Sequence, residues 1–212
     1  MERNLTEGQY LSIATPVDFE INIKRSRFIA SLRSVSNRSE FEKTLKGINS
    51  QYPKASHYCW AYRFLGNPVA EHGSDAGEPS GSAGRPILGA LKKNSLLNIT
   101  AIVTRYFGGI KLGVSGLISA YEETTSQAIL KAEIIVREPM VSLEFGCSYE
   151  IYNLLLDTLK RRNVFPEDIE AAFGEKISGE FKIPLKTINV LLNEIDEMKY
   201  RGYITYRQKS IN

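Results

Sequence analysis

Two glycine-rich segments of this 212-residue chain contain most of the residue types that could do chemistry. Ten of the sixteen glycines fall between Gly66 and Gly116. Dense glycine usually serves tight turns or the close approach of a ligand to the backbone. The first segment runs from His72 to Gly84 and the second from Arg105 to Gly113. Both place charged side chains among the glycines, so both are candidate binding or catalytic loops.

The second segment lies between a predicted strand and a predicted helix. Its glycines allow amide N–H groups to converge near a helix N-terminus, and Arg105 and Lys111 place a cation on each side. This arrangement predicts a phosphate or RNA site, whose candidate residues are Arg105, Tyr106, Phe107, Gly108, Gly109, Lys111, Gly113 and, outside the loop, Arg85. The alternative is a tight strand-to-helix turn with solvated cations. The segment matches neither a Walker loop nor a dinucleotide-binding fingerprint.

The first segment contains Asp75 and Glu78, which could hold a metal or act as an acid–base pair with His72 close in sequence. Short acidic loops rich in Gly and Ser are more often turns whose Asp and Ser side chains cap local amides, and we favour that interpretation. A serine nucleophile is not indicated, because the Gly-x-Ser-x-Gly elbow is missed by one residue. The candidate residues of this loop are Asp75, Gly77, Glu78, Pro79, Ser80, Gly81 and Ser82.

The segment His57–Phe64 alternates strictly and predicts a strand with two different faces. One face is aromatic and is interpreted as core, with base stacking as the alternative: Tyr58, Trp60, Tyr62 and Phe64. On the other face, His57 and Arg63 are expected to support the site. A thiolate of Cys59 activated by His57 is the competing interpretation, but strand neighbours two residues apart point in parallel, so we favour a packed histidine and a buried thiol.

The predicted elements of residues 1–136 alternate strands and helices and indicate an α+β fold. They are strands over 18–24 and 28–35 with a turn at 24–27, a helix from the capping-box pattern Ser39-x-x-Glu42 to Pro53, the strand 57–64, an irregular segment 65–84, a helix over 85–93, a strand over 98–105 and a long helix from Val114 to Ala132.

Residues 137–212 are predicted to form a second, ferredoxin-like domain with the order β-α-β-β-α-β. Arg137-Glu138-Pro139 interrupts the periodicity and marks the boundary. The expected elements are a strand over 140–147, a helix over 151–161, strands over 164–173 and 176–183, a helix over 185–198 and a strand over 203–207.

The composition argues against several classes of protein. No run approaches the roughly 18 apolar residues of a membrane span, and the N-terminus lacks a secretion signal, so we expect a cytoplasmic protein without a membrane partner. Cys59 and Cys147 are too few and too far apart for a disulfide framework or a zinc cluster, and we expect no metal and no cofactor.

Charge is distributed unevenly along the chain. Residues 1–136 carry 16 Lys/Arg against 12 Asp/Glu, whereas residues 137–212 carry 11 against 12. The run from Pro79 to Tyr121 contains five cations and no acidic residue. A patch of one sign attracts phosphate-bearing partners.

Four motifs together resemble the YigZ/IMPACT family: Ser26-Arg27-Phe28-Ile29-Ala30, Ala55-x-His57-x-Cys59-x-Ala61-Tyr62-Arg63, Asp75-x-Gly77-Glu78-Pro79-Ser80-Gly81-x-Ala83-Gly84 and Arg105-Tyr106-Phe107-Gly108-Gly109-x-Lys111-Leu112-Gly113. Two positions depart from the family pattern. Ala76 occupies a position where the family usually has a second Asp, which weakens any mechanism that needs paired carboxylates. Ser82 occupies a position where the family usually has Thr.

The resemblance implies a left-handed β-α-β fold for the first domain, shared with a small-subunit ribosomal protein and the fourth domain of elongation factor G. It implies that the second domain is similar to the C-terminal domain of that factor. Both relatives contact ribosomal RNA. Eukaryotic members modulate translation by binding a regulator of a kinase, but they carry an additional N-terminal domain, so that partnership is not expected here.

Our leading interpretation is a non-enzymatic, translation-associated protein that binds RNA or a ribosomal component through the basic glycine-rich surface. A hydrolase or transferase acting on a phosphorylated or nucleotide-like substrate is the main alternative, and a protein-interaction module is the third. A closed pocket around Asp75, Glu78 and Arg105 would favour the enzyme, and an open basic face would favour the binding protein.

Overall fold

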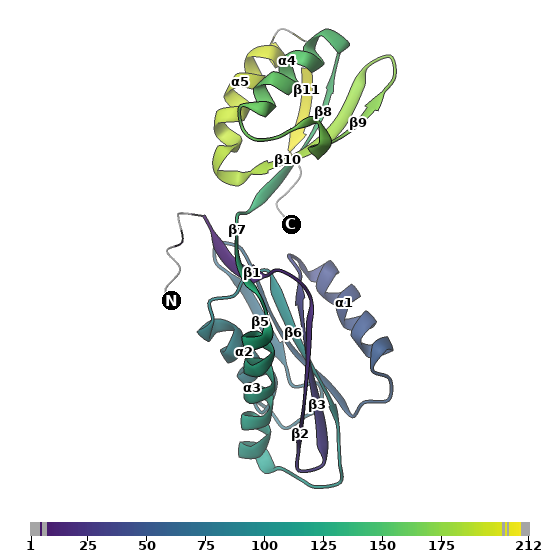
Figure 1. Cartoon of the computed structure of the whole chain (residues 1–212), viewed down its shortest axis with the longest axis vertical. Helices are drawn as coiled ribbons and strands as arrows, with labels where there is room; N and C mark the ends of the chain where they lie inside the picture. The colour runs from purple at the N-terminus through teal and green to yellow at the C-terminus, as the bar shows by residue number, and fades with distance from the viewer. Residues whose placement is uncertain (1–4, 6–7, 201, 203, 209–212) are drawn as a thin grey trace. The chain divides into compact units, whose positions relative to one another are not determined.

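The computed structural model describes residues 5, 8–200, 202 and 204–208 of the chain (Figure 1). It contains two compact units, one formed by Tyr10–Arg137 and the other containing the chain from Glu138 onward. Helices and sheets are mixed in both units, which confirms the α+β fold class. We propose these units as the two domains predicted at 1–136 and 137–212.

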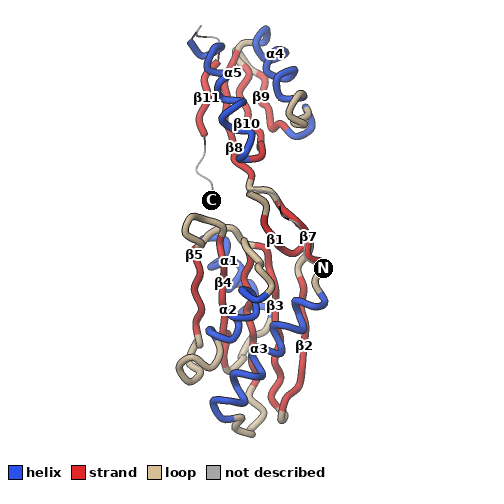
Figure 2. The backbone as a smooth tube through the Cα atoms, turned by 90° about the vertical axis from the view of Figure 1, so that its left-hand side faces the viewer, coloured by secondary structure: helices blue, strands red, loops and turns tan. Residues whose placement is uncertain are grey.

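The first unit is built on an antiparallel sheet of five strands in the order β2-β3-β6-β4-β5. The helices α2 and α3 cover one face of this sheet and α1 lies on the other (Figures 1 and 2). The bounds are β2 Val17–Ile23, β3 Ser26–Ser34, α1 Arg38–Gln51, β4 His57–Phe64, β5 Ala70–Ser74, α2 Gly84–Lys93, β6 Ile99–Tyr106 and α3 Gly113–Lys131.

Strand alternation divides the core of this unit into two clusters. Toward α2 and α3, small and branched side chains of the central strands pack around Tyr121 of α3. Toward α1, Phe41 packs on the aromatic face of β4, with its ring centroid 4.6 Å from Trp60 and 5.1 Å from Tyr62. Tyr62 and Phe64 are buried, so this part of the aromatic stripe is core, as predicted.

The β2–β3 hairpin closes with a two-residue turn. Lys24 and Arg25 both have positive φ, 44° and 68°, the combination that a type I′ turn requires. Ser26 and Arg27, which were predicted to belong to the turn, are the first residues of β3. The two turn cations are therefore presented at the end of the sheet.

The predicted N-cap of α1, Ser39, is wrong, because the helix begins two residues earlier. Asn37 is the N-cap, and its Oδ1 accepts a hydrogen bond from the Glu40 amide at 2.9 Å. The Glu40 carboxylate in turn accepts a hydrogen bond from the Ser36 amide at 2.8 Å. The side chain of Glu42, the acidic residue of the predicted capping box, instead pairs with Arg38 at 2.8 Å.

The segment 65–84 is not irregular throughout, because β5 forms within it and pairs with β4. Two further short strands, β1 Tyr10–Ile13 and β7 Ile134–Arg137, were not predicted and pair with each other as a two-stranded antiparallel sheet. No helix in the described part of the chain has the length and apolar character needed to cross a bilayer.

The second unit has the predicted order β8-α4-β9-β10-α5-β11, and its four strands are arranged β11-β8-β10-β9. Inward-facing residues of the sheet pack against α4 and α5 in a separate core. The bounds are β8 Met140–Cys147, α4 Tyr149–Lys160, β9 Ile169–Phe173, β10 Ile177–Pro184, α5 Ile188–Tyr200 and β11 Ile204–Gln208, with short 3-10 turns at Pro166–Asp168 and Leu185–Thr187. Tyr203, the predicted start of the last strand, lies outside the described residues.

Candidate functional site

The β2–β3 turn, the start of β4 and the end of β6 meet at one end of the five-stranded sheet. The strand register places Arg105 of β6 opposite Phe28 of β3 on one side and His57 of β4 on the other. The loop between β6 and α3 continues from this point. Three chain segments that are distant in sequence therefore share one surface (Figure 2).

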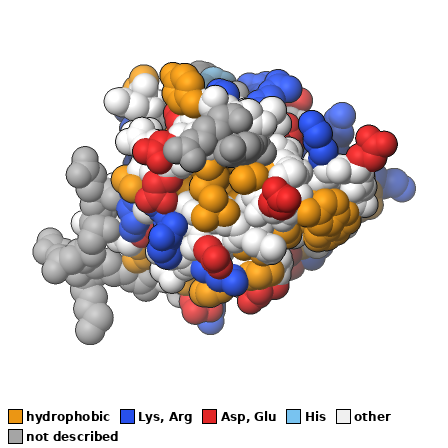
Figure 3. All heavy atoms as spheres, turned by 90° about the horizontal axis from the view of Figure 1, so that it is seen from above, with side chains coloured by type: hydrophobic (Ala, Val, Ile, Leu, Met, Phe, Trp, Pro, Cys, Tyr) orange, Lys and Arg blue, Asp and Glu red, His pale blue; other side chains and the backbone are white. Residues whose placement is uncertain are grey.

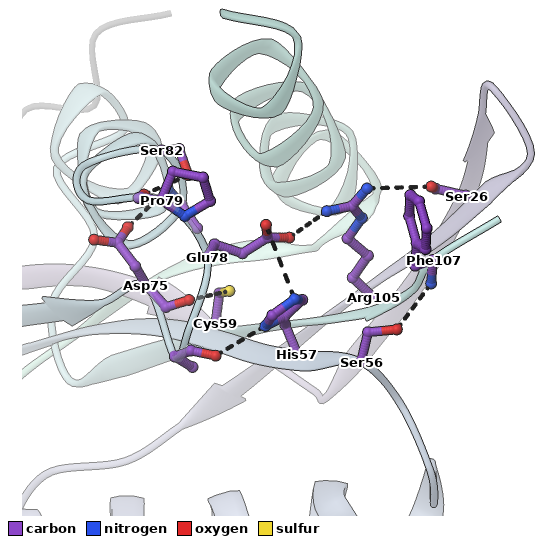
Figure 4. A network of polar contacts seen from close by, with 12 residues as sticks. Ser26, Ser56, His57, Cys59, Asp75, Glu78, Pro79, Ser82, Arg105 and Phe107 are labelled. Carbon is purple, nitrogen blue, oxygen red and sulfur yellow. Dashed lines mark hydrogen bonds and ion pairs between the residues drawn. The ribbon is translucent and has the colours of Figure 1, made fainter. Parts of the chain in front are cut away.

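Arg105 is buried rather than exposed beside the loop. Its side chain is 5 % exposed, and its Nη1 donates to Glu78 Oε1 at 2.6 Å. Its Nη2 donates to Ser26 Oγ at 3.3 Å (Figure 4). Arg105 was predicted to flank a phosphate site or, alternatively, to pair with Asp75 or Glu78, and its side chain pairs with the buried carboxylate of Glu78.

Glu78 is the centre of this buried network. The Tyr121 hydroxyl donates to Glu78 Oε1 at 2.7 Å, so the carboxylate joins α3 to β6 through Arg105. His57 Nε2 lies 4.0 Å from the second carboxylate oxygen, and its Nδ1 lies 3.0 Å from the Ala76 carbonyl. Burial raises the pKa of Tyr121, reinforced by Cys59 and Glu78 beside it.

Asp75 caps the loop that precedes α2. Its carboxylate accepts three backbone N–H groups, from Gly81, Ala83 and Gly84, each at 2.8 Å. Burial opposes the charge on Asp75, but these three donors outweigh it and lower the pKa of the carboxyl. The favoured interpretation, a turn whose Asp caps local amides, agrees with these contacts.

The remaining residues of the first loop complete the turn. Ser82 is buried and its hydroxyl donates to the Pro79 carbonyl at 2.6 Å. Gly77 and Gly81 have φ of +89° and +75°, a region that favours glycine. Pro79 and Ser80 lie exposed at the turn.

Both cysteines are buried and free. The Cys59 thiol donates to the Asp75 carbonyl at 2.9 Å, and burial raises its pKa to about 12. Such a thiol is a poor nucleophile at neutral pH. Among the described residues, no group of three or more His, Cys, Asp or Glu side chains is arranged to hold a metal ion.

The glycine loop after β6 is tied to the hairpin turn by its backbone. A Cβ on Gly108 would lie 1.9 Å from the Arg25 carbonyl oxygen, so only glycine fits there. The Gly108 amide donates to Ser26 Oγ at 3.3 Å and the Phe107 amide to Ser56 Oγ at 3.0 Å. These two amides are engaged inside the protein and are therefore not available to bind an anion.

The surface of this end of the sheet combines cations with apolar side chains. We call it the basic tip and define it by the exposed residues Lys24, Arg25, Phe107, Ile110 and Lys111. The three cations form no ion pair with any residue that the structure describes. Phe107 is 46 % exposed, although its backbone amide is hydrogen-bonded to Ser56.

The other residues predicted for the phosphate or RNA site have structural roles or lie outside the basic tip. Tyr106 donates its hydroxyl to the Pro53 carbonyl at 3.0 Å and lies under the Arg27 guanidinium. Gly109 and Gly113 have φ of +84° and +75° and shape the loop. Arg85 is exposed in the first turn of α2.

Arg63 is not part of the basic tip. It pairs with Glu71 at 3.0 Å and donates to the Leu96 carbonyl near the opposite end of the sheet. Sequence reasoning missed Ser26, Ser56 and Tyr121, whose partners lie up to 82 positions away in the chain.

The charge pattern of the basic tip differs from that of another face of the molecule. In the view of Figure 3, Lys and Arg side chains alternate with Asp and Glu, and hydrophobic side chains lie between them. A mixed surface of this kind is common in globular proteins, whereas cations without acidic neighbours create a local positive potential.

Comparison with known proteins identifies relatives that align over most of the chain. Residues 24–129 match the family model described as the Impact N-terminal domain. The chain is 33 % identical over 210 residues to "IMPACT family member YvyE" of Bacillus subtilis (strain 168), which spans 96 % of this chain and 95 % of the relative. It is 35 % identical over 193 residues to an "IMPACT family member" of Haemophilus influenzae, spanning 90 % and 92 %.

One solved structure has a similar fold over nearly the full length. It is the crystal structure of a protein described as hypothetical, with a TM-score of 0.67 and 25 % identity, and the match spans 98 % of this chain and 99 % of that one. The fold of this chain therefore recurs in a solved structure.

Proposed function

This chain belongs to the IMPACT family, and on that premise we propose that it is a translation-associated binding protein that recognises RNA through the basic tip. The proposal rests on the chemistry of the tip and on the resemblance of the first domain to RNA-contacting translation proteins. We favour binding over catalysis because the carboxylates beneath the tip are engaged inside the protein.

The observation that carries the proposal is the gathering of Lys24, Arg25 and Lys111 on one surface without acidic partners among the described residues. Exposed cations of this kind neutralise phosphates and release counterions, which supplies most of the affinity for nucleic acid. The packing of Gly108 against Arg25 brings the two cationic segments together, although about 85 positions separate them in the chain.

The buried network below the tip supports a binding role over a hydrolase or transferase. Asp75 is occupied by three backbone amides, and Glu78 by Arg105 and Tyr121. The carboxylates that the enzymatic alternative requires are thus engaged in holding the first loop, β6 and α3 in place. Their arrangement gives the tip a rigid base.

The test is filter binding of the protein to ribosomal RNA at about physiological salt. Lys111→Ala should weaken binding several-fold with little change in melting temperature, because Lys111 is exposed and its removal costs under about 0.5 kcal/mol of stability. Lys93→Ala is the matched control, since Lys93 is an exposed lysine at the end of α2, beyond the opposite end of β6.

Equal affinities of wild type, Lys111→Ala and Lys93→Ala would contradict RNA recognition by the tip. Equal weakening by both substitutions would indicate a general charge effect and would also contradict it. Binding to a ribosomal protein that survives ribonuclease treatment and depends on Lys111 would favour the protein-interaction alternative.

A further inference from the structure

Phe107 has an anchored backbone and an exposed side chain, and the proposed phosphate contacts of the cations explain neither. Its amide donates to Ser56 Oγ at 3.0 Å, and the next residue, Gly108, is locked against Arg25. The Arg105 guanidinium lies 5.3 Å from the Phe107 ring centroid, so it supports the ring from below. Phe107 nevertheless remains 46 % exposed.

The support beneath Phe107 is itself rigid. The Arg105 guanidinium lies over the ring of Phe107 and over the ring of Phe28, at 5.3 Å from each centroid, and Phe28 is fully buried. The ion pair with Glu78 fixes the guanidinium in this stack. An exposed aromatic ring with so little freedom loses little conformational entropy when a flat ligand covers it.

We propose that Phe107 is a stacking platform for an unpaired RNA base, with the phosphates on either side of that nucleotide contacted by Lys111 and by the turn cations Lys24 and Arg25. This inference rests on the proposed function and narrows its ligand to RNA that is single-stranded or has an extruded base. Bases present a flat π face regardless of sequence, and stacking on an aromatic side chain is a recurrent feature of single-strand recognition.

Charge favours RNA over a protein partner at this platform. Lys24 and Arg25 lie in the turn against which Gly108 packs, and Lys111 follows Phe107 in the same loop, so the tip offers cations to a polyanion and an exposed ring to its flat bases. Duplex RNA would offer phosphates but keep its bases inside the stack, out of reach of Phe107.

The experiment measures binding of the full-length protein to two fluorescent dodecamers by anisotropy. One is oligouridine, which is unpaired, and the other is an abasic sugar-phosphate chain of the same length and charge. Phe107→Leu should weaken oligouridine binding by about 5- to 150-fold, the factor expected for one base–aromatic stack, and leave abasic binding unchanged. Phe107→Tyr should bind oligouridine like wild type.

Phe165→Leu is the matched control, because Phe165 is 42 % exposed in the second unit. Melting temperatures of all variants verify folding. If Phe107→Leu binds oligouridine like wild type while Lys111→Ala is weakened, the stacking inference fails and the proposed function stands. If Phe107→Leu loses both dodecamers equally, the platform is also contradicted. If wild type binds neither oligonucleotide nor ribosomal RNA, both proposals fail together.

Discussion

The buried carboxylate of Glu78 accepts hydrogen bonds from both Arg105 and Tyr121. Its side chain is 4 % exposed, and the ion pair to Arg105 is 2.6 Å long. A buried pair is expensive to desolvate, so its contribution to net stability is modest, but breaking it by removing one partner is costly. The network therefore acts mainly as a geometric constraint that places β6 and α3 relative to the first loop.

We expect Glu78→Gln to lower the free energy of unfolding by about 3–5 kcal/mol, because Arg105 would be left buried without a counter-charge. Urea denaturation followed by circular dichroism measures the change. Glu42→Gln is the control, since Glu42 forms an exposed i,i+4 pair with Arg38 and should cost about 0.5 kcal/mol or less. Similar small losses in both variants would show that the buried pair has no structural role.

The buried thiol of Cys59 leads to a prediction about pH. Burial raises its pKa to about 12, so the thiolate fraction stays negligible up to pH 9, whereas an unperturbed thiol has a pKa near 8.5. Alkylation of the folded protein by iodoacetamide should be slow at pH 8, and its rate should still rise about tenfold per pH unit at pH 9, because this whole range lies below the raised pKa. In urea, the rate should be far higher and should level off above about pH 8.5. Fast labelling of Cys59 in the folded protein at pH 8 would contradict this assignment.

At the scale of elements, Gly108 couples the loop after β6 to the β2–β3 turn. An added Cβ would meet the Arg25 carbonyl at 1.9 Å, far inside contact distance, so the loop would have to move away from the turn. Gly109 and Gly113 are required for a different reason. Each has a positive φ that favours glycine, although the space around each would admit a Cβ.

Gly108→Ala should therefore destabilise the protein and weaken RNA binding, because it separates Lys111 from the turn cations. Gly47→Ala provides the opposite case: Gly47 lies inside α1 with open space around it, and alanine there should stabilise by up to about 1 kcal/mol. Thermal melts of the two variants check the signs. A Gly108→Ala protein that melts and binds like wild type would show that the loop and the turn are not coupled.

Most regular elements could be predicted from periodicity, and the exceptions have local causes. β5 has the sequence Ala-Glu-His-Gly-Ser, which lacks the branched and aromatic residues typical of strands, and it forms because β4 offers an unpaired edge. The cap of α1 was misplaced because Ser39 and Asn37 are both good caps, and only the backbone geometry selects Asn37.

At the scale of the whole molecule, the strand order determines which residues meet. The order β2-β3-β6-β4 brings together residues near positions 25, 57 and 105, and no local pattern in the sequence records that adjacency. The sequence motifs pointed to the two glycine-rich loops as candidate functional segments. They left open whether Arg105 flanks a phosphate site or pairs with Asp75 or Glu78, because that choice depends on which face of β6 the helices α2 and α3 cover.

The central claim is that Lys24, Arg25 and Lys111 bind phosphates of RNA, and the dependence of affinity on salt tests it most directly. The measurement compares wild type with the variant Lys24→Asn/Arg25→Gly/Lys111→Ala, in which Asn-Gly suits the type I′ turn. For unpaired RNA, each neutralised phosphate contributes about −0.7 to the slope of log K against log salt. We predict that the slope of the variant is shallower by about 2, and an unchanged slope in a variant that folds like wild type would contradict the account.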